Sequence, residues 1–241
     1  MDVSIIITSY NYCQYIEEAI NSCLDQKTKF SFEVIIVDDG STDNTREILS
    51  KYSKHCNIKL IENSGVEVAS NMGVRASLAP CFVRLDADDS LKVDFIEKIY
   101  PLFQSSNLNF IYSNYDIIDK DSRVINSMNL PPYLHQEILN RGDFLASGTI
   151  VKKEIFDLLG GYNENTRNSG LENYELILQF ISSGYDGLLL NENLFNYRIH
   201  PSNMSKERRS SIVKYGKALF AKEGYGKFST NEYHPYGLKL I

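Results

Sequence analysis

The first half of the chain alternates short segments typical of buried strands with longer segments that have helical periodicity. The strand-like segments are Val3–Thr8, Glu33–Val37 and Cys81–Leu85, and β-branched residues are frequent in them. Strands that alternate with helices across short links favour parallel pairing and right-handed crossovers. Continuous apolar strands also need cover on both faces. We therefore expect an α/β fold with a mostly parallel central sheet and helices on both faces.

The second half of the chain is less regular and predicts a mixed C-terminal portion. A hairpin is expected at residues 115–125 and a helix at 171–183. Two separate strands are expected at 187–190 and 195–199. No internal repeat or low-complexity segment divides the chain.

Composition and charge limit the partners of the chain. Hydrophobic residues make up 43% of the 241 residues and charged residues 23%, as in ordinary globular domains. The net charge of −6 argues against nucleic-acid binding, although residues 204–241 carry eight Lys or Arg against three Asp or Glu. No signal peptide or membrane-spanning apolar run is recognised. We expect a cytoplasmic protein with reduced, mostly buried cysteines.

Acidic or polar turns follow the predicted strands. Asp86, Asp88 and Asp89 come directly after one strand, Asp38 and Asp39 after another, and the polar stretch 8–11 ends the first strand. Ligands of such sheets bind at the carboxyl ends of the strands, so these turns should form one site. Carboxylates this close repel one another and need a cation. A divalent metal that carries phosphate oxygens is the simplest candidate.

Four segments of the chain form one pattern by their order and spacing. They are Ser4-Ile5-Ile6-Ile7-Thr8-Ser9-Tyr10-Asn11, Val37-Asp38-Asp39-Gly40-Ser41-Thr42-Asp43, Asn71-Met72-Gly73 and Leu85-Asp86-Ala87-Asp88-Asp89. Together they resemble the family 2 glycosyltransferases. The resemblance implies the Rossmann-like GT-A fold. It implies a glycosyltransferase domain over residues 1–205, with a nucleotide-binding half (1–114) and an acceptor-binding half (115–205). Residues 206–241 would form a basic, partly helical extension.

The resemblance also implies a nucleotide site at the first two turns. Thr8, Tyr10 and Asp39 would hold the base, with Asp38 beside them, and Asp86 would reach the ribose or the water shell of a metal. Two alternatives stay open at this point. The aspartates of the second turn could be turn and capping residues, and Tyr10 could serve only in packing.

The metal and the donor sugar complete the implied site. Asp88 would ligate magnesium or manganese, His200 would face the metal or the diphosphate, and Gly148 would lie beside the donor sugar. The alternatives are a satisfied core histidine at 200, a small strand residue at 148, and a helix cap at Asp89.

The proton-accepting residue departs from the family pattern. An inverting transferase needs a general base, and the position of the usual aspartate is Asn173, whose neutral amide cannot accept the proton. The neighbouring Glu172 is our first candidate, kept ionised by a pKa that the helix N-terminus lowers. Glu175, about one turn on, is the second candidate. A protein that binds the donor without rapid transfer is the third possibility.

We therefore expect a metal-dependent, inverting glycosyltransferase that uses a nucleoside diphosphate sugar of UDP type. Its acceptor would be a glycan or a lipid-linked molecule, as in bacterial surface polysaccharide synthesis, and the basic tail could contact the inner face of the membrane. One rival is a non-catalytic or weakly active nucleotide-sugar binding protein, which the residue at position 173 suggests. The other is a sugar nucleotidyltransferase, although the first turn lacks the glycine and basic residues typical of that class.

Overall fold

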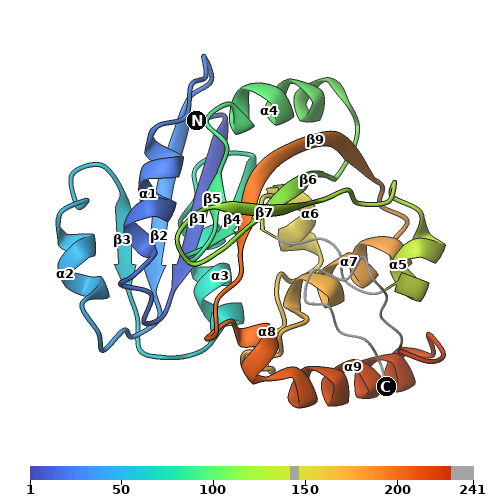
Figure 1. The fold of residues 1–241 in the computed structure, drawn as a ribbon. Helices are drawn as coiled ribbons and strands as arrows, with labels where there is room; N and C mark the ends of the chain where they lie inside the picture. The colour runs from blue at the N-terminus through green and yellow to red at the C-terminus, as the bar shows by residue number, and fades with distance from the viewer. Residues whose placement is uncertain (142–146, 229–241) are drawn as a thin grey trace.

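The computed structural model describes residues 1–141 and 147–228. Its strands form one sheet in the order β3-β2-β1-β4-β8-β6-β9-β5, and β7 pairs with β6 beside this path (Figure 1). The strands in chain order are β1 (Val3–Ser9), β2 (Phe32–Asp38), β3 (Asn57–Leu60), β4 (Cys81–Asp86), β5 (Ser90–Leu91), β6 (Phe110–Ile118), β7 (Val124–Met128), β8 (Ile150–Lys152) and β9 (Gly187–Arg198).

Helices connect and cover these strands. In chain order they are α1 (Ile16–Leu24), α2 (Thr45–Ser50), α3 (Val66–Ala76), α4 (Phe95–Ser105), α5 (His135–Arg141), α6 (Lys153–Leu158), α7 (Glu172–Ser182), α8 (Met204–Glu207) and α9 (Arg209–Glu223). In α1, Ile16, Ala19, Ile20 and Cys23 recur at helical spacing and form its buried face.

The N-terminal part is the parallel sheet expected from the sequence. β1 pairs in parallel with β2 and β4, and β2 pairs in parallel with β3. β1 is buried at every position, so both of its faces are covered. A Cβ atom at Gly73 of α3 would overlap the side chain of Ile6, so this glycine lets the helix lie close against the sheet. The α/β fold predicted from the sequence is confirmed.

The C-terminal part mixes strand directions, as predicted. β8 runs antiparallel to β4 and β6, while β9 runs parallel to β6. The predicted hairpin is formed by β6 and β7. The prediction of two separate strands at 187–190 and 195–199 is wrong, because β9 continues from Gly187 to Arg198. The register of β9 against β6 shifts near Asn114, at the polar residues 191–193 that separate the two predicted strands.

The first helix of the predicted C-terminal extension packs against the rest of the protein. Phe220 of α9 stacks on Tyr174 of α7 with 6.0 Å between ring centroids, and Ile212 and Leu219 are buried. Residues 229–241 lie outside the described residues, so the domain boundary at 205 stays a prediction. All four cysteines are free thiols, three of them buried. In the described part of the chain, no helix combines the length and apolar character needed to cross a membrane.

Candidate active site

A pocket of ≈ 670 Å³ lies at the carboxyl ends of β1, β2 and β4. Thr8 pairs with Asp86 across β1 and β4, and the Asp39 N–H donates to the Ser9 carbonyl at 2.8 Å. These contacts bring the three polar turns together, as the sequence predicted, and Thr8, Asp39 and Asp86 all line the pocket. We call this side of the pocket the strand-end wall; it consists of Thr8, Tyr10, Asp39, Asp86 and Asp88.

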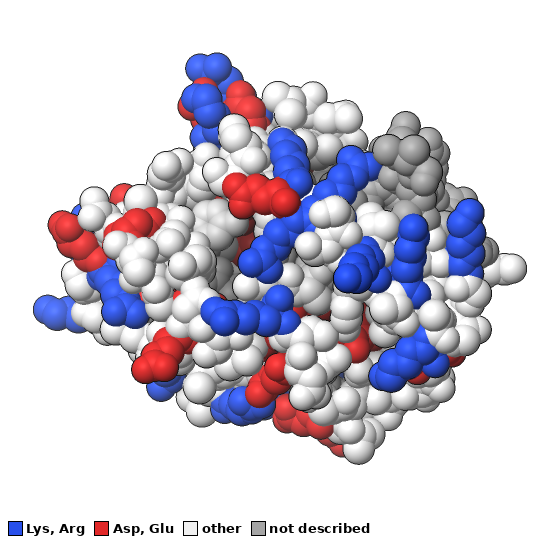
Figure 2. Space-filling model, turned by 90° about the horizontal axis from the view of Figure 1, so that it is seen from below, with Lys and Arg blue, Asp and Glu red and all other residues white. Residues whose placement is uncertain are grey.

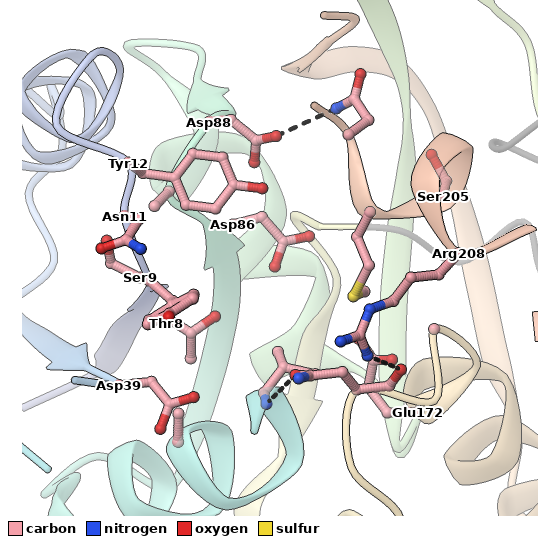
Figure 3. A pocket seen from close by; sticks show the side chains of 18 of the residues that line it. Thr8, Ser9, Asn11, Tyr12, Asp39, Asp86, Asp88, Glu172, Ser205 and Arg208 are labelled. Carbon is pink, nitrogen blue, oxygen red and sulfur yellow. Dashed lines mark hydrogen bonds between the residues drawn. The ribbon is translucent and has the colours of Figure 1, made fainter. Parts of the chain in front are cut away.

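The opposite side of the pocket comes from later parts of the chain. Figure 3 shows Glu172, Ser205 and Arg208 facing the strand-end wall across the cavity. Glu172 is the first residue of α7, Ser205 lies in α8, and Arg208 joins α8 to α9. We call these three residues the helix wall. The pocket therefore unites residues that lie about two hundred positions apart in the sequence.

Asn11 fixes the first turn against the second. It adopts φ +59°, a left-handed conformation that asparagine tolerates better than most residues. Its Oδ1 accepts the backbone N–H of Thr42 at 2.7 Å and of Asp43 at 3.3 Å. The adjacent Tyr10 keeps 44% of its surface exposed while lining the pocket. Its ring is therefore available to a planar ligand, and plain packing does not account for it.

Asp39 and Asp38 have different surroundings although they are adjacent. Asp39 accepts the N–H of Ser64 at 2.6 Å on one oxygen and the N–H of Gly65 at 2.9 Å on the other. Each oxygen keeps a second acceptor direction, and the residue lines the pocket.

Asp38 does not reach the pocket. Its buried carboxylate accepts from Arg46 Nε at 2.8 Å and from the Ser41 N–H at 3.3 Å. The predicted nucleotide contact of Asp38 is therefore not supported, and the turn-residue alternative accounts for it.

Arg84 links the two walls of the pocket. Its guanidinium donates to Asp86 Oδ1 at 3.0 Å and to Glu172 Oε1 at 2.9 Å, and the side chain is 5% exposed. The other oxygen of Asp86 accepts from the Ser147 hydroxyl at 3.0 Å. Asp86 still presents 31% of its side chain to solvent, so it remains available to a ligand.

Asp88 is hydrogen-bonded to two residues from the segment after β9. Its Oδ2 contacts His200 Nε2 at 2.9 Å and accepts from Asn203 Nδ2 at 3.3 Å. Burial raises the pKa of Asp88, and the charge of Asp86 adds to this, while the hydrogen bond to His200 opposes it. His200 packs against Tyr15 and does not line the pocket. The structure therefore makes His200 a partner of Asp88, and its predicted place as a direct metal ligand is not supported.

Asp89 is the third carboxylate of the acidic run. Its Oδ1 accepts the backbone N–H of Arg198 at 3.0 Å, which ties the turn to the end of β9. Burial raises its pKa strongly, and the charge of Asp88 adds to the effect. Helix α4 begins after Asp94 instead, so the alternative of Asp89 as a helix cap is wrong.

The donor set suits a divalent cation that takes most of its ligands from elsewhere. Among residues 1–141 and 147–228, no three His, Cys, Asp or Glu side chains form a metal cage. Asp86 and Asp88 do line the pocket together. Magnesium commonly binds through one or two carboxylates and completes its shell with phosphates and water. The two carboxylates therefore fit a cation that arrives with a phosphorylated ligand.

Glu172 is the carboxylate of the helix wall. Its Oε1 pairs with Arg84, and its Oε2 is buried without a hydrogen-bond partner among the described residues. Burial raises the pKa of Glu172, although Arg84 lowers it. The expectation that the helix N-terminus would depress this pKa is wrong, because the cost of desolvating the charge is larger.

The other two candidate positions for the base lie away from the pocket. Asn173 accepts a hydrogen bond from the Tyr162 hydroxyl at 3.1 Å on its Oδ1. Glu175 accepts from Asn163 Nδ2 at 2.9 Å and from the Tyr215 hydroxyl at 2.7 Å. Neither Asn173 nor Glu175 lines the pocket. Of the candidates raised from the sequence, only Glu172 faces the cavity.

Gly148 has a packing role. It adopts φ +80°, and a Cβ atom there would lie 2.8 Å from the ring of Phe195. Its N–H donates to the Arg84 carbonyl at 3.0 Å. A side chain is therefore excluded by both backbone conformation and space. Gly148 does not line the pocket, so the predicted contact with a donor sugar is not supported.

Sequence reasoning missed much of the helix wall and the loop before α7. These pocket residues are Arg167, Asn168, Asn203, Ser205 and Arg208. A signal was available for Asn203, because it lies in the polar turn that follows β9 as the other polar turns follow their strands. No comparable signal marks residues 167 and 168, which packing brings to the pocket from between α6 and α7.

Comparisons with known proteins agree with this architecture. The family model described as "Glycosyl transferase family 2" matches residues 4–157. The putative teichuronic acid biosynthesis glycosyltransferase TuaG of Bacillus subtilis (strain 168) is 30% identical over 219 residues, covering 88% of this chain and 84% of TuaG. The UDP-Glc:alpha-D-GlcNAc-diphosphoundecaprenol beta-1,3-glucosyltransferase WfaP of Escherichia coli is 29% identical over 222 residues, covering 90% of this chain and 85% of WfaP.

A solved structure shows the same fold. The crystal structure of S. aureus TarS 1–349 in complex with UDP-GlcNAc matches with a TM-score of 0.73 and 19% identity, covering 94% of this chain and 67% of that one. The family match extends over more than half of the chain and includes the strand-end wall. The chain therefore belongs to glycosyl transferase family 2, and it is a nucleotide-sugar-dependent glycosyltransferase with the GT-A fold.

Proposed function

We propose that this protein is a metal-dependent, inverting glycosyltransferase whose donor is a UDP-sugar and whose acceptor is a glycan or a lipid-linked molecule. The observation that carries the proposal is the pairing of the two walls around one cavity. Carboxylates suited to a nucleotide and a cation lie on the strand-end wall. The helix wall carries a buried carboxylate, one oxygen of which has no hydrogen-bond partner among the described residues. The TuaG and WfaP relatives support a role in bacterial surface polysaccharide synthesis.

The strand-end wall would bind the donor. Asp39 has acceptor capacity left for a base N–H, and the exposed ring of Tyr10 would stack on the base. Thr8 lines the same wall near the end of β1. Asp86 and Asp88 would hold the divalent cation, with His200 orienting Asp88. The cation would supply positive charge for the diphosphate as it departs.

The helix wall would accept the proton. Glu172 Oε2 would take the proton of an acceptor hydroxyl while the hydroxyl oxygen forms its bond to the anomeric carbon. The bond from that carbon to the donor phosphate breaks at the same time, and its electron pair leaves with the nucleoside diphosphate. A single displacement of this kind inverts the anomeric configuration. The raised pKa of Glu172 makes it a stronger base than an ordinary glutamate.

The basic face of the C-terminal helices supports contact with the inner face of a membrane. Figure 2 shows Lys and Arg side chains gathered on the side of the molecule that carries α9. Lys214, Lys217 and Lys222 of α9 are exposed. Basic residues near an anionic leaflet each contribute on the order of 1 kcal/mol to binding. A lipid-linked acceptor would then be delivered on the side where the protein meets the membrane.

Ligand-induced stabilisation tests the donor assignment. The melting temperature would be measured with UDP, GDP, ADP and the corresponding sugars, each with and without manganese. A ligand at 100 times its Kd stabilises the native state by about 2.7 kcal/mol, so a shift with UDP ligands that manganese enlarges is expected. The Asp88→Asn variant should lose the manganese-dependent part.

Two results would contradict the proposal. The first is the absence of a shift with every nucleoside diphosphate. The second, in a reaction with donor and acceptor, is release of pyrophosphate, which would favour a nucleotidyltransferase. Product configuration, read from the anomeric proton coupling, tests inversion separately.

A further inference from the structure

Among the described residues, three arginine side chains line the pocket, and their contacts differ. Arg84 is buried between Asp86 and Glu172 and bridges the two walls. Arg167 donates from Nη2 to the backbone carbonyl and the side chain of Asn63. The third is Arg208, which lies at the junction of α8 and α9.

Arg208 makes a different set of contacts. It is exposed, and its Nη1 donates to the backbone carbonyl of Asn168 at 3.2 Å. It forms no ion pair with a carboxylate among residues 1–141 and 147–228. Figure 3 shows its side chain reaching from the helix wall into the cavity, on the side opposite Asp86. The hydrogen bond to Asn168 orients the guanidinium, and its other N–H groups can donate to a ligand.

The negative charge of the pocket favours a cationic side chain on the helix wall. Asp39, Asp86, Asp88 and Glu172 already line the cavity. A diphosphate adds further negative charge, and that charge grows on the leaving oxygen as the bond to the sugar breaks. Buried Arg84 is paired on both sides, so it cannot neutralise the leaving group without releasing a carboxylate. A guanidinium can contact two phosphate oxygens at once, which makes arginine well suited to the task.

We infer that Arg208 binds the diphosphate of the donor from the helix wall and stabilises the departing nucleoside diphosphate. It would act across the cavity from the carboxylates of the strand-end wall. The segment after β9, which carries Arg208, would then form part of the donor site. This inference rests on the proposed function, because it assumes a nucleoside diphosphate in the pocket.

The Arg208→Gln variant tests the inference against ligands with and without phosphates. Calorimetric titration would compare UDP with uridine in the presence of manganese. Loss of a charge-assisted contact should weaken UDP binding by about 10- to 100-fold and leave uridine binding unchanged. The value of kcat/KM for the donor should fall by at least the same factor. Arg208→Lys, which keeps the charge but loses the planar fork, should recover part of the loss.

Lys54→Gln is the control, because Lys54 is an exposed cation that lies outside both the pocket and the basic face of α9. It should bind UDP and transfer sugar as the unchanged protein does. Equal UDP affinity and equal transfer in Arg208→Gln and the unchanged protein would overturn the inference. An equal loss of affinity for UDP and for uridine would also overturn it, since that result would show that Arg208 only supports the structure of the helix wall. If the unchanged protein binds no nucleoside diphosphate, the proposed function itself fails.

Discussion

The two walls of the pocket use their carboxylates differently. On the strand-end wall, both oxygens of Asp39 accept backbone N–H groups, at 2.6 and 2.9 Å. On the helix wall, one oxygen of Glu172 pairs with Arg84 and the other is buried without a partner among the described residues. A carboxylate held by two N–H groups is a fixed acceptor suited to binding. A desolvated carboxylate with a raised pKa is suited to taking up a proton.

The largest effect is expected from Glu172→Gln, which removes the proton acceptor and keeps the oxygen that Arg84 contacts. Transfer should fall by about 10²- to 10⁴-fold, the usual contribution of a general base, while UDP affinity changes little. Single-turnover sugar transfer and calorimetric UDP binding would be measured on the same preparation. Glu175→Gln is the control, since that carboxylate lies off the pocket. Equal losses of transfer in Glu172→Gln and Glu175→Gln would contradict the assignment of Glu172 as the base.

A smaller effect is expected from Asp39→Asn on the strand-end wall. The amide nitrogen would face the N–H of Ser64 or Gly65, so the residue loses acceptor capacity. UDP affinity should fall by about 10- to 100-fold, and calorimetric titration would measure it.

The neighbouring Asp38→Asn variant is the control for Asp39. It should leave UDP affinity unchanged and cost about 1–2 kcal/mol of stability, because Arg46 loses its charged partner. The interpretation of the second turn would be wrong if Asp38→Asn weakened UDP binding as much as Asp39→Asn.

The smallest effect is a shift in the pH dependence of kcat. Glu172 must be ionised to accept a proton, so transfer should decline as pH falls through its pKa. Because burial raises that pKa above the ordinary 4.5, the decline should begin at higher pH than for an exposed glutamate. Arg84 lowers the same pKa, so Arg84→Gln should move the decline to still higher pH. A decline centred near 4.5 in both proteins would show that Glu172 does not control the profile.

The strand-end wall could be predicted from the sequence because its residues follow strands whose order and direction the pattern indicates. Parallel register then places Thr8 beside Asp86 without further information. The choice between Asp38 and Asp39 could not be read in the same way. Adjacent residues at a strand end point to opposite sides, and a shift of one position exchanges them.

The helix wall was harder to predict for a different reason. Ser205 and Arg208 reach the pocket only because α9 packs on α7 through contacts such as Phe220 with Tyr174. Such long-range packing leaves no local pattern in the sequence. The pKa of Glu172 was predicted in the wrong direction for a related reason, because the position of a helix end is visible in the sequence and the burial of the side chain is not.

Transfer by the double variant Glu172→Gln/Asn173→Asp tests the central claim most directly. It moves the carboxylate by one residue, to the position that accepts the Tyr162 hydroxyl and lies off the pocket. If Glu172 is the base because its side chain lines the cavity and that of residue 173 does not, the double variant should be as inactive as Glu172→Gln. Recovery of transfer toward that of the unchanged protein would contradict the account and place the base at residue 173.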